Sequence, residues 1–353
     1  MSIFNSKLET FGLDLSDRSI KVAQFKEKRE KLKLFSYGRC DIPEGLIVNG
    51  EIKDELEVAE LIKKTLRTSN INPIKSKFVI YSIPEPKGFI RVITIPFAKE
   101  GDIEQAIMYE AEQLFPIDIE ESYVDWQVLF SNEKEMRVIV AVVPMALVDS
   151  YSSVMVSAGL NPVAAEIESI AITRSLISNK KSSRPILIID LGKDRTSFII
   201  FKYPAVQFTA SIPVCGNEFI AAISRKLNIN EQKAEEVKMK CGLNFQGECK
   251  EVFKAMQPSL YEMIRYINKL TSYYKEHFDL NGDISKVIIC GGESKMVGLS
   301  SFLSLQIKKE IEKGNPWINI TFEEGKEIPP ISREDSLVFV TVLGLAARGI
   351  KEF

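Results

Sequence analysis

The chain has 353 residues, which suggests two or three domains at the usual domain size. Its 46 Lys and Arg nearly balance 48 Asp and Glu, and no basic run alternates with aromatic residues, so nothing indicates a nucleic-acid-binding protein. Hydrophobic residues make up 45%, enough for a sizeable core. His277, the one histidine, leaves almost no material for a histidine-based catalytic triad or metal cluster.

Cysteine spacing and apolar runs bear on the cellular compartment. No two of the five cysteines form a CxxC pair, so we expect neither a disulfide framework nor a zinc site, and a reducing compartment fits. The first ten residues, MSIFNSKLET, lack the apolar core of a signal peptide. Residues 138–148, the longest apolar stretch, are interrupted by Pro144 and fall short of the roughly 20 residues that span a bilayer. We expect a cytoplasmic protein that reaches a membrane only through partners.

An internal repeat begins at the first predicted strand. Near the start of the chain, short turns join three predicted strands, residues 11–15, 19–25 and 32–37. In the second half the same order returns in residues 186–191, 196–201 and 205–212. The first strand of each set is almost wholly apolar and ends in a carboxylate followed by Leu and a small residue, as Asp14-Leu15-Ser16 and Asp190-Leu191-Gly192. This pattern predicts a duplicated core. Chance similarity of two β-meanders is the alternative.

Helices and strands alternate between the two repeats. In chain order the pattern predicts a helix at 56–69, strands at 77–83 and 90–95, a helix at 102–115, strands at 123–130 and 137–143, and a helix at 147–158. Residues 80–158 therefore form a candidate inserted subdomain. The polar segment 178–185, SNKKSSRP, is the clearest linker.

Helices dominate the rest of the second half. The apolar spacing predicts helices at 216–227, 230–240, 258–278, 299–311 and 336–349. Residues 286–290 form a strand of the buried type, and Gly291 and Gly292 follow it at once.

The duplicated hairpins are the first candidate site. An aspartate at the end of each first strand, Asp14 and Asp190, suits Mg²⁺, which keeps several waters and takes one or two carboxylates with phosphate oxygens. Small residues in tight turns let backbone N–H groups approach phosphates. The nearby small residues and donors are Ser16, Ser19, Lys21, Gly192 and Thr196. The alternative is two ordinary hairpins with Asp as a turn former.

Three further features are compatible with a nucleotide site. The Gly291-Gly292 turn allows a backbone to approach a ligand closely, or is a simple strand-to-helix turn. Glu235 and Lys238 are three apart on a helix and either hold ribose hydroxyls or form a solvated ion pair. Glu168 either positions a water for attack on a γ-phosphate or is a buried structural carboxylate.

These features, in this order, resemble the actin-like ATPase superfamily. The chain is most similar to its PilM family of type IV pilus assembly proteins, relatives of FtsA. The matching stretches are FGLDLSDRSIKVAQF, SIPEPKGFIRVITIP followed by DIEQAIMYEAEQLFPIDIEESYVDWQVL, and the tail LGLAARG. The resemblance implies an α/β, two-lobed actin-like ATPase fold, with duplicated ribonuclease-H-like cores and an inserted α+β subdomain.

The resemblance also implies a division into four parts. Residues 1–79, 159–180 and 333–353 would form the first lobe, 80–158 the inserted FtsA-like subdomain, 184–215 and 279–332 the second lobe, and 216–278 a helical nucleotide-contacting subdomain.

The cofactors implied by the resemblance are ATP and Mg²⁺. Position by position, Asp14 and Asp190 would surround Mg²⁺, Ser16, Ser19, Lys21, Gly192 and Thr196 would line the phosphates, Glu235 and Lys238 would contact the ribose, and Gly291, Gly292 and Glu293 would border the adenosine. Glu168 and Asp190 would be the catalytic carboxylates. Lys193 replaces a small residue of the second loop and Cys215 replaces a glycine, and both departures bear on turnover more than on binding.

The function implied is that of a cytoplasmic ATP-binding adaptor for type IV pilus assembly. Its inserted subdomain would bind the N-terminal cytoplasmic peptide of a PilN-like inner-membrane protein, and other pilus proteins or a second copy are further expected partners. An active ATPase that drives assembly is the first alternative. An FtsA-like filament or scaffold protein is the second, and the absence of a basic amphipathic helix after residue 349 argues against it.

Overall fold

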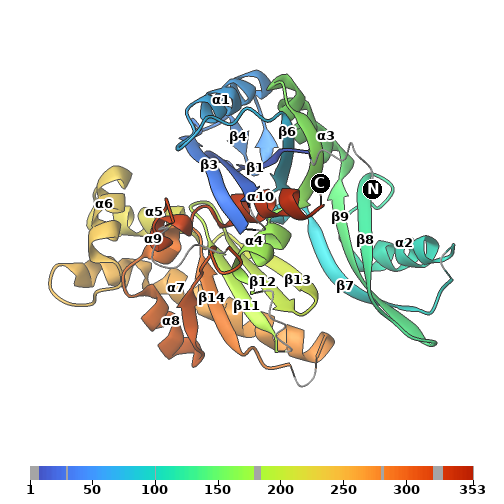
Figure 1. Ribbon diagram of the computed structural model, residues 1–353. Coiled ribbons are helices and arrows are strands. Elements are labelled where there is room, and N and C mark those ends of the chain that lie inside the picture. The colour runs from blue at the N-terminus through green and yellow to red at the C-terminus, as the bar shows by residue number, and fades with distance from the viewer. Residues whose placement is uncertain are drawn as a thin grey trace. The chain divides into compact units, whose positions relative to one another are not determined.

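The structure, a computed structural model, describes residues 8–28, 31–99, 101–178, 184–279, 282–320 and 329–352 (Figure 1). The chain forms two compact units. Unit 1 comprises Met1–Asn179 and Asn315–Phe353, and unit 2 comprises Lys180–Gly314. The linker predicted at 178–185 lies mostly outside the described residues.

A mixed five-stranded sheet forms the core of unit 1, in the order β10-β6-β1-β2-β3. Its strands are β1 (Thr10–Leu15), β2 (Ser19–Lys28), β3 (Lys31–Asp41), β6 (Phe78–Ile83) and β10 (Asn161–Ile167). The strands β1, β6 and β10 are parallel, whereas β1, β2 and β3 form an antiparallel meander. Every residue of β1 is buried, because helices cover both faces of the sheet.

Helices pack in pairs on the two faces of this sheet. One face carries α4 (Glu168–Leu176) and α10 (Val340–Glu352), and the other carries α1 (Glu55–Arg67) and α3 (Met145–Ser157). The short helix α9 (Arg333–Ser336) precedes α10. A small hairpin of β4 (Ile47–Val48) and β5 (Glu51–Ile52) precedes α1.

Glycines let α10 approach its neighbours closely. A Cβ added at Gly344 would collide with the carbonyl oxygen of Ala171 on α4, and one at Gly12 of β1 would lie 2.6 Å from the carbonyl oxygen of Val342. The tail LGLAARG is therefore part of the core of unit 1. Chain segments from both ends of the sequence meet in this core.

The C-terminal segment of unit 1 begins at Asn315, before the predicted boundary at residue 333. Trp317 and Ile331 are buried in one cluster with Phe25 and Phe339. The Asn319 side-chain amide donates hydrogen bonds to two carbonyl oxygens at the end of α4. Residues from Asn315 onward therefore belong to unit 1, because their apolar side chains find their core there.

Residues 84–144 of unit 1 carry the elements predicted for the inserted subdomain. An antiparallel sheet in the order β7-β9-β8 is covered by α2 (Ile103–Leu114), whose buried residues pack on alternate residues of β9. The strands are β7 (Phe89–Pro96), β8 (Ser122–Ser131) and β9 (Glu135–Pro144), and the short 3-10 helix η1 (Glu85–Lys87) precedes them. We call residues 84–144 the insert.

Unit 2 repeats the core topology of unit 1. Its strands are β11 (Ile186–Leu191), β12 (Thr196–Lys202), β13 (Ala205–Ile212), β14 (Lys286–Cys290) and β15 (Ile311–Lys313). As in unit 1, the first strand begins an antiparallel meander and pairs on its other edge with a parallel strand, here β14. The register is also the same, with Asp14 opposite Lys21 and Asp190 opposite Ser197. The duplicated core predicted from the repeat is confirmed.

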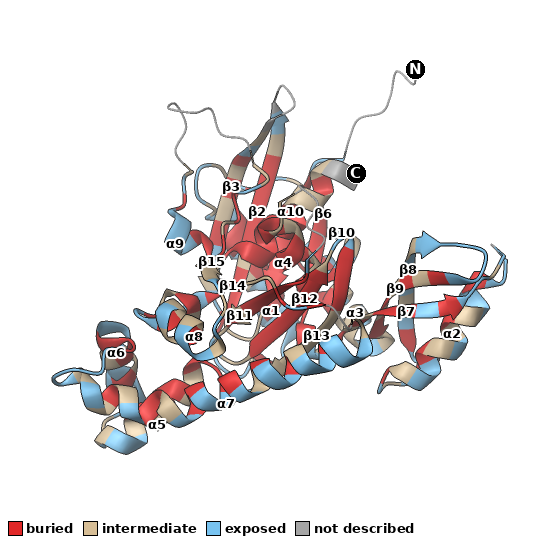
Figure 2. Ribbon diagram, turned by 90° about the horizontal axis from the view of Figure 1, so that it is seen from below, coloured by how far each residue is buried: buried red, intermediate tan, exposed pale blue. Residues whose placement is uncertain are grey.

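The helices of unit 2 depart from the prediction at two ends. They are α5 (Gly216–Leu227), α6 (Glu231–Cys241), α7 (Cys249–His277), the 3-10 helix η2 (Gly292–Lys295) and α8 (Leu299–Ile307). The helix α7 continues through Pro258 because its apolar face, buried toward the strands in Figure 2, begins at Val252. The helix α8 ends at Ile307, where Lys308 takes a left-handed conformation and the chain turns into β15.

The cysteine expectation was wrong at one pair. Cys241, at the end of α6, and Cys249, at the start of α7, form a disulfide. A CxxC criterion does not detect this pair, because the two cysteines are eight positions apart and the turn between two helices brings them together. Cys40, Cys215 and Cys290 are free thiols.

Candidate functional site

In unit 1 the predicted metal carboxylate lies at the carboxyl end of β1. The Lys21 ammonium donates to Asp14 Oδ2 at 2.8 Å, and the Ser82 hydroxyl donates to Asp14 Oδ1 at 2.9 Å. The Asp14 and Lys21 side chains are only 5% and 12% exposed, so the pair is held inside the protein at the sheet edge. Ser82 was missed from the sequence; its place at the carboxyl end of a neighbouring parallel strand is the signal that could have found it.

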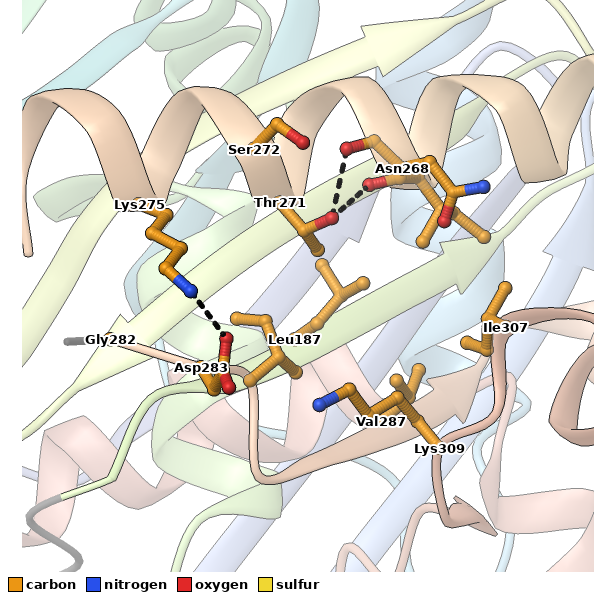
Figure 3. Close-up of a pocket in the computed structure, with 12 residues that line it drawn as sticks. Leu187, Asn268, Thr271, Ser272, Lys275, Gly282, Asp283, Val287, Ile307 and Lys309 are labelled. Carbon is orange, nitrogen blue, oxygen red and sulfur yellow. Dashed lines mark hydrogen bonds and ion pairs between the residues drawn. The ribbon is translucent and has the colours of Figure 1, made fainter. Parts of the chain in front are cut away.

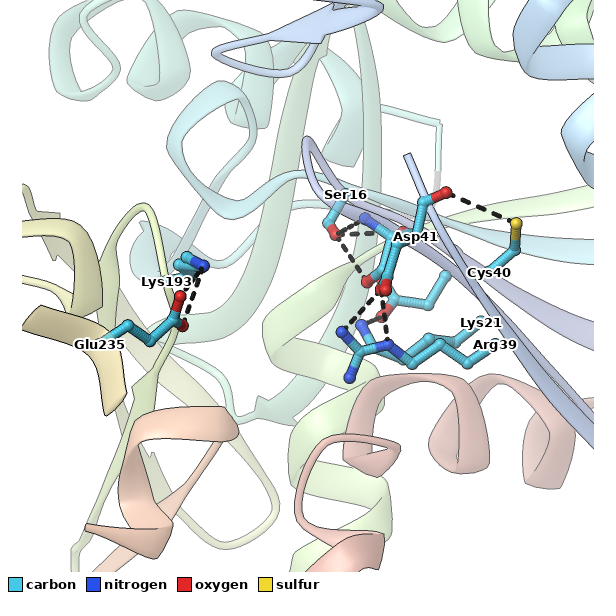
Figure 4. A network of polar contacts seen from close by, with 9 residues as sticks. Ser16, Lys21, Arg39, Cys40, Asp41, Lys193 and Glu235 are labelled. Atoms are coloured by element: carbon cyan, nitrogen blue, oxygen red, sulfur yellow. Dashed lines mark hydrogen bonds and ion pairs between the residues drawn. The ribbon is translucent and has the colours of Figure 1, made fainter. Parts of the chain in front are cut away.

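The turn between β1 and β2 is tied together by its serines. The Ser16 N–H and hydroxyl both donate to the Ser19 carbonyl oxygen, at 3.0 and 3.1 Å, and the Ser19 N–H donates back to Ser16 Oγ at 3.2 Å. This close turn, drawn with Ser16 and Lys21 in Figure 4, places hydroxyl, amide and ammonium donors in one region. Such donors are the groups that recognise phosphate.

Glu168 begins α4 at the carboxyl end of β10, and it is buried. The Glu85 N–H donates to Glu168 Oε2 at 3.0 Å and holds that carboxylate in place. Glu85 itself follows β6, so three neighbouring parallel strands each end in an acidic side chain, counting Asp14. The sequence interpretation missed Glu85, although it directly follows a predicted strand and Pro84.

In unit 2 the second aspartate occupies the matching place. Asp190 lies at the end of β11, and the Cys290 thiol donates to its Oδ1 at 3.7 Å. Burial, and then the neighbouring Asp190 charge, raise the pKa of the Cys290 thiol well above its ordinary value, so the thiol stays protonated and remains a donor. Gly291 has a φ of 83°, and a Cβ there would collide with the Asp190 carboxylate, so only glycine fits this approach.

The turn after β11 is bound to the start of α5. The Gly192 carbonyl oxygen accepts from the Gly216 N–H at 3.1 Å, and the Lys193 carbonyl oxygen accepts from the Asn217 N–H at 2.8 Å. The Lys193 ammonium reaches both oxygens of Glu235 on α6, at 3.0 and 3.2 Å (Figure 4). Lys193 thus contacts Glu235, one of the two residues expected to contact the ribose.

The remaining predicted residues of unit 2 separate into inward and outward groups. Lys238 is buried and donates to both oxygens of Glu293, at 2.9 and 2.8 Å, instead of facing outward with Glu235. Thr196 is also fully buried, and its hydroxyl donates to the Val214 carbonyl oxygen at 2.6 Å. Gly292 is exposed at the start of η2. The burial of Lys238 was predictable, because Lys238 lies on the same face of α6 as Ala234 and Cys241.

A separate hollow of about 280 Å³ lies at the opposite ends of the same strands (Figure 3). Leu187 and Val287, near the starts of β11 and β14, and residues of α7 line it. The Lys275 ammonium at its edge lies 3.3 Å from Asp283 Oδ1. This hollow is therefore distinct from the carboxyl-end residues described above.

These residues fit a magnesium nucleotide in each unit taken separately. Each unit presents one buried or half-buried aspartate at the carboxyl end of a parallel strand, where open α/β sheets bind ligands. Unit 1 adds the Lys21 ammonium and the serine turn, and unit 2 adds Gly291, where a Cβ would collide with the Asp190 carboxylate. In each unit the aspartate carboxylate would hold Mg²⁺ through waters, and the bound ion would screen the phosphate charge.

The duplicated meanders, each with a strand-end aspartate, define a protein of the actin-like ATPase fold. The family model for the type IV pilus assembly protein PilM matches residues 12–350, and the chain belongs to this family. Both the fold and the family expected from the sequence are thereby confirmed.

Solved structures of several proteins share this fold. The chain is similar to a protein of a PilM–PilN type IV pilus biogenesis complex, with a TM-score of 0.82, 23% identity, and 98% of this chain and 99% of that one covered. MreB5 of Spiroplasma citri bound to AMPPNP gives 0.56, 15% identity and 94% of both chains. EutJ from Carboxydothermus hydrogenoformans gives 0.56, 14% identity, and 95% and 88%. No helix among the described residues of the present chain has the length and apolar character to cross a bilayer.

Proposed function

We propose that the chain is a cytoplasmic, ATP-binding adaptor of type IV pilus assembly. In this proposal the strand-end aspartates bind Mg·ATP, and the bound nucleotide favours the conformation that takes up a partner. The partner is the N-terminal cytoplasmic peptide of a PilN-like inner-membrane protein, bound at the insert. Membership of the PilM family supports the pilus role.

The matched aspartates carry the nucleotide part of the proposal. Asp14 and Asp190 occupy equivalent register positions in two copies of one meander, each at the carboxyl end of a strand with a parallel neighbour. The same residue type at the same register position in both units supports one shared ligand-binding role for the two aspartates. MreB5, which shares this fold, was solved bound to the nucleotide analogue AMPPNP, and this supports nucleotide binding as the proposed role.

The partner part of the proposal has a different support. The structure most similar among those described above comes from a PilM–PilN complex and covers nearly the whole chain. A short extended peptide is the partner class we propose, because extended segments bind exposed sheet edges and apolar grooves through main-chain hydrogen bonds and pockets. In the insert, β8 is the last strand of its sheet among the described residues.

Steady ATP hydrolysis is the second candidate function, and Glu168 is the observation that favours it. A buried carboxylate at the start of α4, held by the Glu85 amide, has the fixed orientation that a water-positioning residue requires. Under this alternative, Glu168→Gln abolishes phosphate release and leaves Mg·ATP affinity nearly unchanged.

Calorimetric titration with Mg·ATP, with phosphate release followed in parallel, tests the proposal. We expect the wild type to bind and release little phosphate. Asp14→Ala/Asp190→Ala should bind at least about a hundredfold more weakly, because each carboxylate makes charge-assisted contacts of about 1.5 kcal/mol or more. Asp125→Ala, at an exposed aspartate of β8, is the matched control and should bind like the wild type.

The outcomes separate the two functions. Binding without turnover supports the adaptor, whereas steady phosphate release that Glu168→Gln abolishes supports the ATPase. Equal affinities in the wild type and the double variant would overturn the site assignment.

A further inference from the structure

A small hairpin of unit 1 touches both the serine turn and the insert. Residues 47–52, which we call the strap, consist of β4, the Asn49-Gly50 turn and β5. Asn49 and Gly50 have φ angles of 52° and 77°, as in a type I′ turn, for which Asn-Gly is the preferred sequence. With two residues in each strand, the strap is too short to be stable alone, so the groups it contacts set its position.

The first anchor of the strap is the turn between β1 and β2. The Asp17 carboxylate accepts the Asn49 N–H at 2.8 Å and the Gly50 N–H at 2.9 Å, one on each oxygen. Asp17 lies between Ser16 and Ser19, the residues that we assign to phosphate binding. Two charge-assisted hydrogen bonds therefore tie the strap to this turn.

The second anchor is the point where the chain leaves the insert. The Gly50 carbonyl oxygen accepts a hydrogen bond of 3.0 Å from the Tyr151 hydroxyl. Tyr151 is fully buried on α3, the helix that directly follows β9. The strap therefore connects the serine turn to the exit of the insert through two residues, Asp17 and Gly50.

The third anchor is the entry of the insert. The Lys87 ammonium lies 3.2 Å from Glu51 Oε1, and a Cβ on Gly50 would lie 3.1 Å from the Pro84 ring. The next residue, Glu85, donates its N–H to Glu168, and a Cβ on Gly88 would lie 2.7 Å from Ile167 Cδ1. The entry is thus held by Glu85, which contacts the candidate residue Glu168, and the exit is held by Gly50, which also contacts Asp17 of the serine turn.

We propose that the strap couples nucleotide binding at the serine turn to the conformation of the insert. Nucleotide binding displaces the turn, Asp17 carries the strap with it, and Tyr151 and Lys87 transmit the displacement to the two crossings. Coupling of this kind is reciprocal, so occupation of the insert by a partner changes nucleotide affinity by the same factor. The inference rests on the proposed function, because it requires a nucleotide at the serine turn.

Hydrogen–deuterium exchange with and without saturating Mg·ATP tests the coupling, and calorimetry on the same samples confirms that nucleotide is bound. In the wild type, Mg·ATP should change exchange in residues 47–52, 84–93 and 145–151 by about fivefold or more, the lower end of the usual coupling range. Tyr151→Phe removes the hydroxyl and keeps the ring. It should bind Mg·ATP within about twofold of wild type, retain the response at 47–52 and lose it at 145–151.

Two further variants keep the test decisive. Tyr123→Phe removes another tyrosine hydrogen bond, the one to Asp149, and should respond like the wild type. Asp17→Ala removes the first anchor and, at saturating Mg·ATP, should abolish the response at 47–52 as well as at the crossings. It also replaces Tyr151→Phe as the test variant if the latter does not fold.

The proposal and its premise fail in different ways. If calorimetry detects no nucleotide binding to the wild type, the proposed function falls and this inference with it. The coupling is overturned, and the binding site stands, if nucleotide binds but exchange at the crossings of the wild type is unchanged. The same holds if residues 145–151 respond equally in the wild type and in Tyr151→Phe.

Discussion

A buried ion pair is the clearest residue-scale feature of unit 2. Lys238 is 1% exposed, and its ammonium contacts both oxygens of Glu293, which is 13% exposed. Taking two charges out of water is unfavourable unless each satisfies the other, as it does in this pair. A Cβ on Gly216 would collide with the Glu293 carboxylate, so the pair also requires glycine at the start of α5. We infer that Lys238 orients Glu293, whereas Glu235 faces outward toward Lys193.

Lys238→Met should reduce the free energy of unfolding by about 3 kcal/mol, because Glu293 is left buried without its partner. The double variant Lys238→Met/Glu293→Gln should lose less, since it buries no uncompensated charge. Urea denaturation measures both. Lys240→Met, at an exposed position of the same helix, is the control. Equal losses in the Lys238 and Lys240 variants would show that the pair has no structural role.

At the scale of elements, the connection between α6 and α7 constrains the same region. The disulfide closes a loop of nine residues, and within that loop the Leu243 N–H donates to the Val297 carbonyl oxygen at 2.8 Å. A Cβ on Gly242 would lie 2.9 Å from the Val297 side chain. The end of α6 is therefore fixed both covalently and by the turn that precedes α8.

Reduction of this disulfide should reduce the free energy of unfolding by about 2.5 kcal/mol, from the entropy that loop closure removes from the unfolded chain. Guanidinium denaturation with and without dithiothreitol measures the difference. Cys249→Ser should abolish the response to reductant, and Cys40→Ser, at a free thiol, should leave it intact. Denatured, unreduced protein should titrate as three thiols; five would contradict the pairing.

At the scale of the whole molecule, the two units are built differently along the chain. Unit 2 is one continuous segment, whereas unit 1 combines the first half of the chain with its last residues. In unit 1, α10 packs on β1, β2 and α4, and the glycine contacts leave no space between these elements. The core of unit 1 therefore includes a segment that follows unit 2 in the sequence.

Deletion of residues 333–353 should prevent unit 1 from folding, because it exposes the buried face of β1 and α4. Residues 184–314 expressed alone should still give the dispersed amide spectrum of a folded domain, since the core of unit 2 is contained in that segment. Two-dimensional NMR of both fragments is the measurement. A cooperatively folded deletion variant would show that α10 is dispensable.

The sequence by itself determined the features that depend on local pattern. The apolar strands ending in Asp14 and Asp190 repeat within one chain, and strand periodicity and turn residues are local properties, so the duplicated meander was predictable. The elements of the insert were predictable for the same reason, with a helix that follows one strand and precedes two. Family resemblance then supplied the nucleotide and the partner as hypotheses.

Only the tertiary structure decided the features that depend on contacts between distant segments. Lys238 turns toward Glu293, 55 positions away, and the Asn49–Gly50 turn finds Asp17, 32 and 33 positions away. Likewise, Trp317 and its neighbours, near the end of the chain, are buried in the core of unit 1. Such contacts form because they bury apolar side chains and pair charges in three dimensions. The spacing of residues along the chain does not indicate which distant residues will meet.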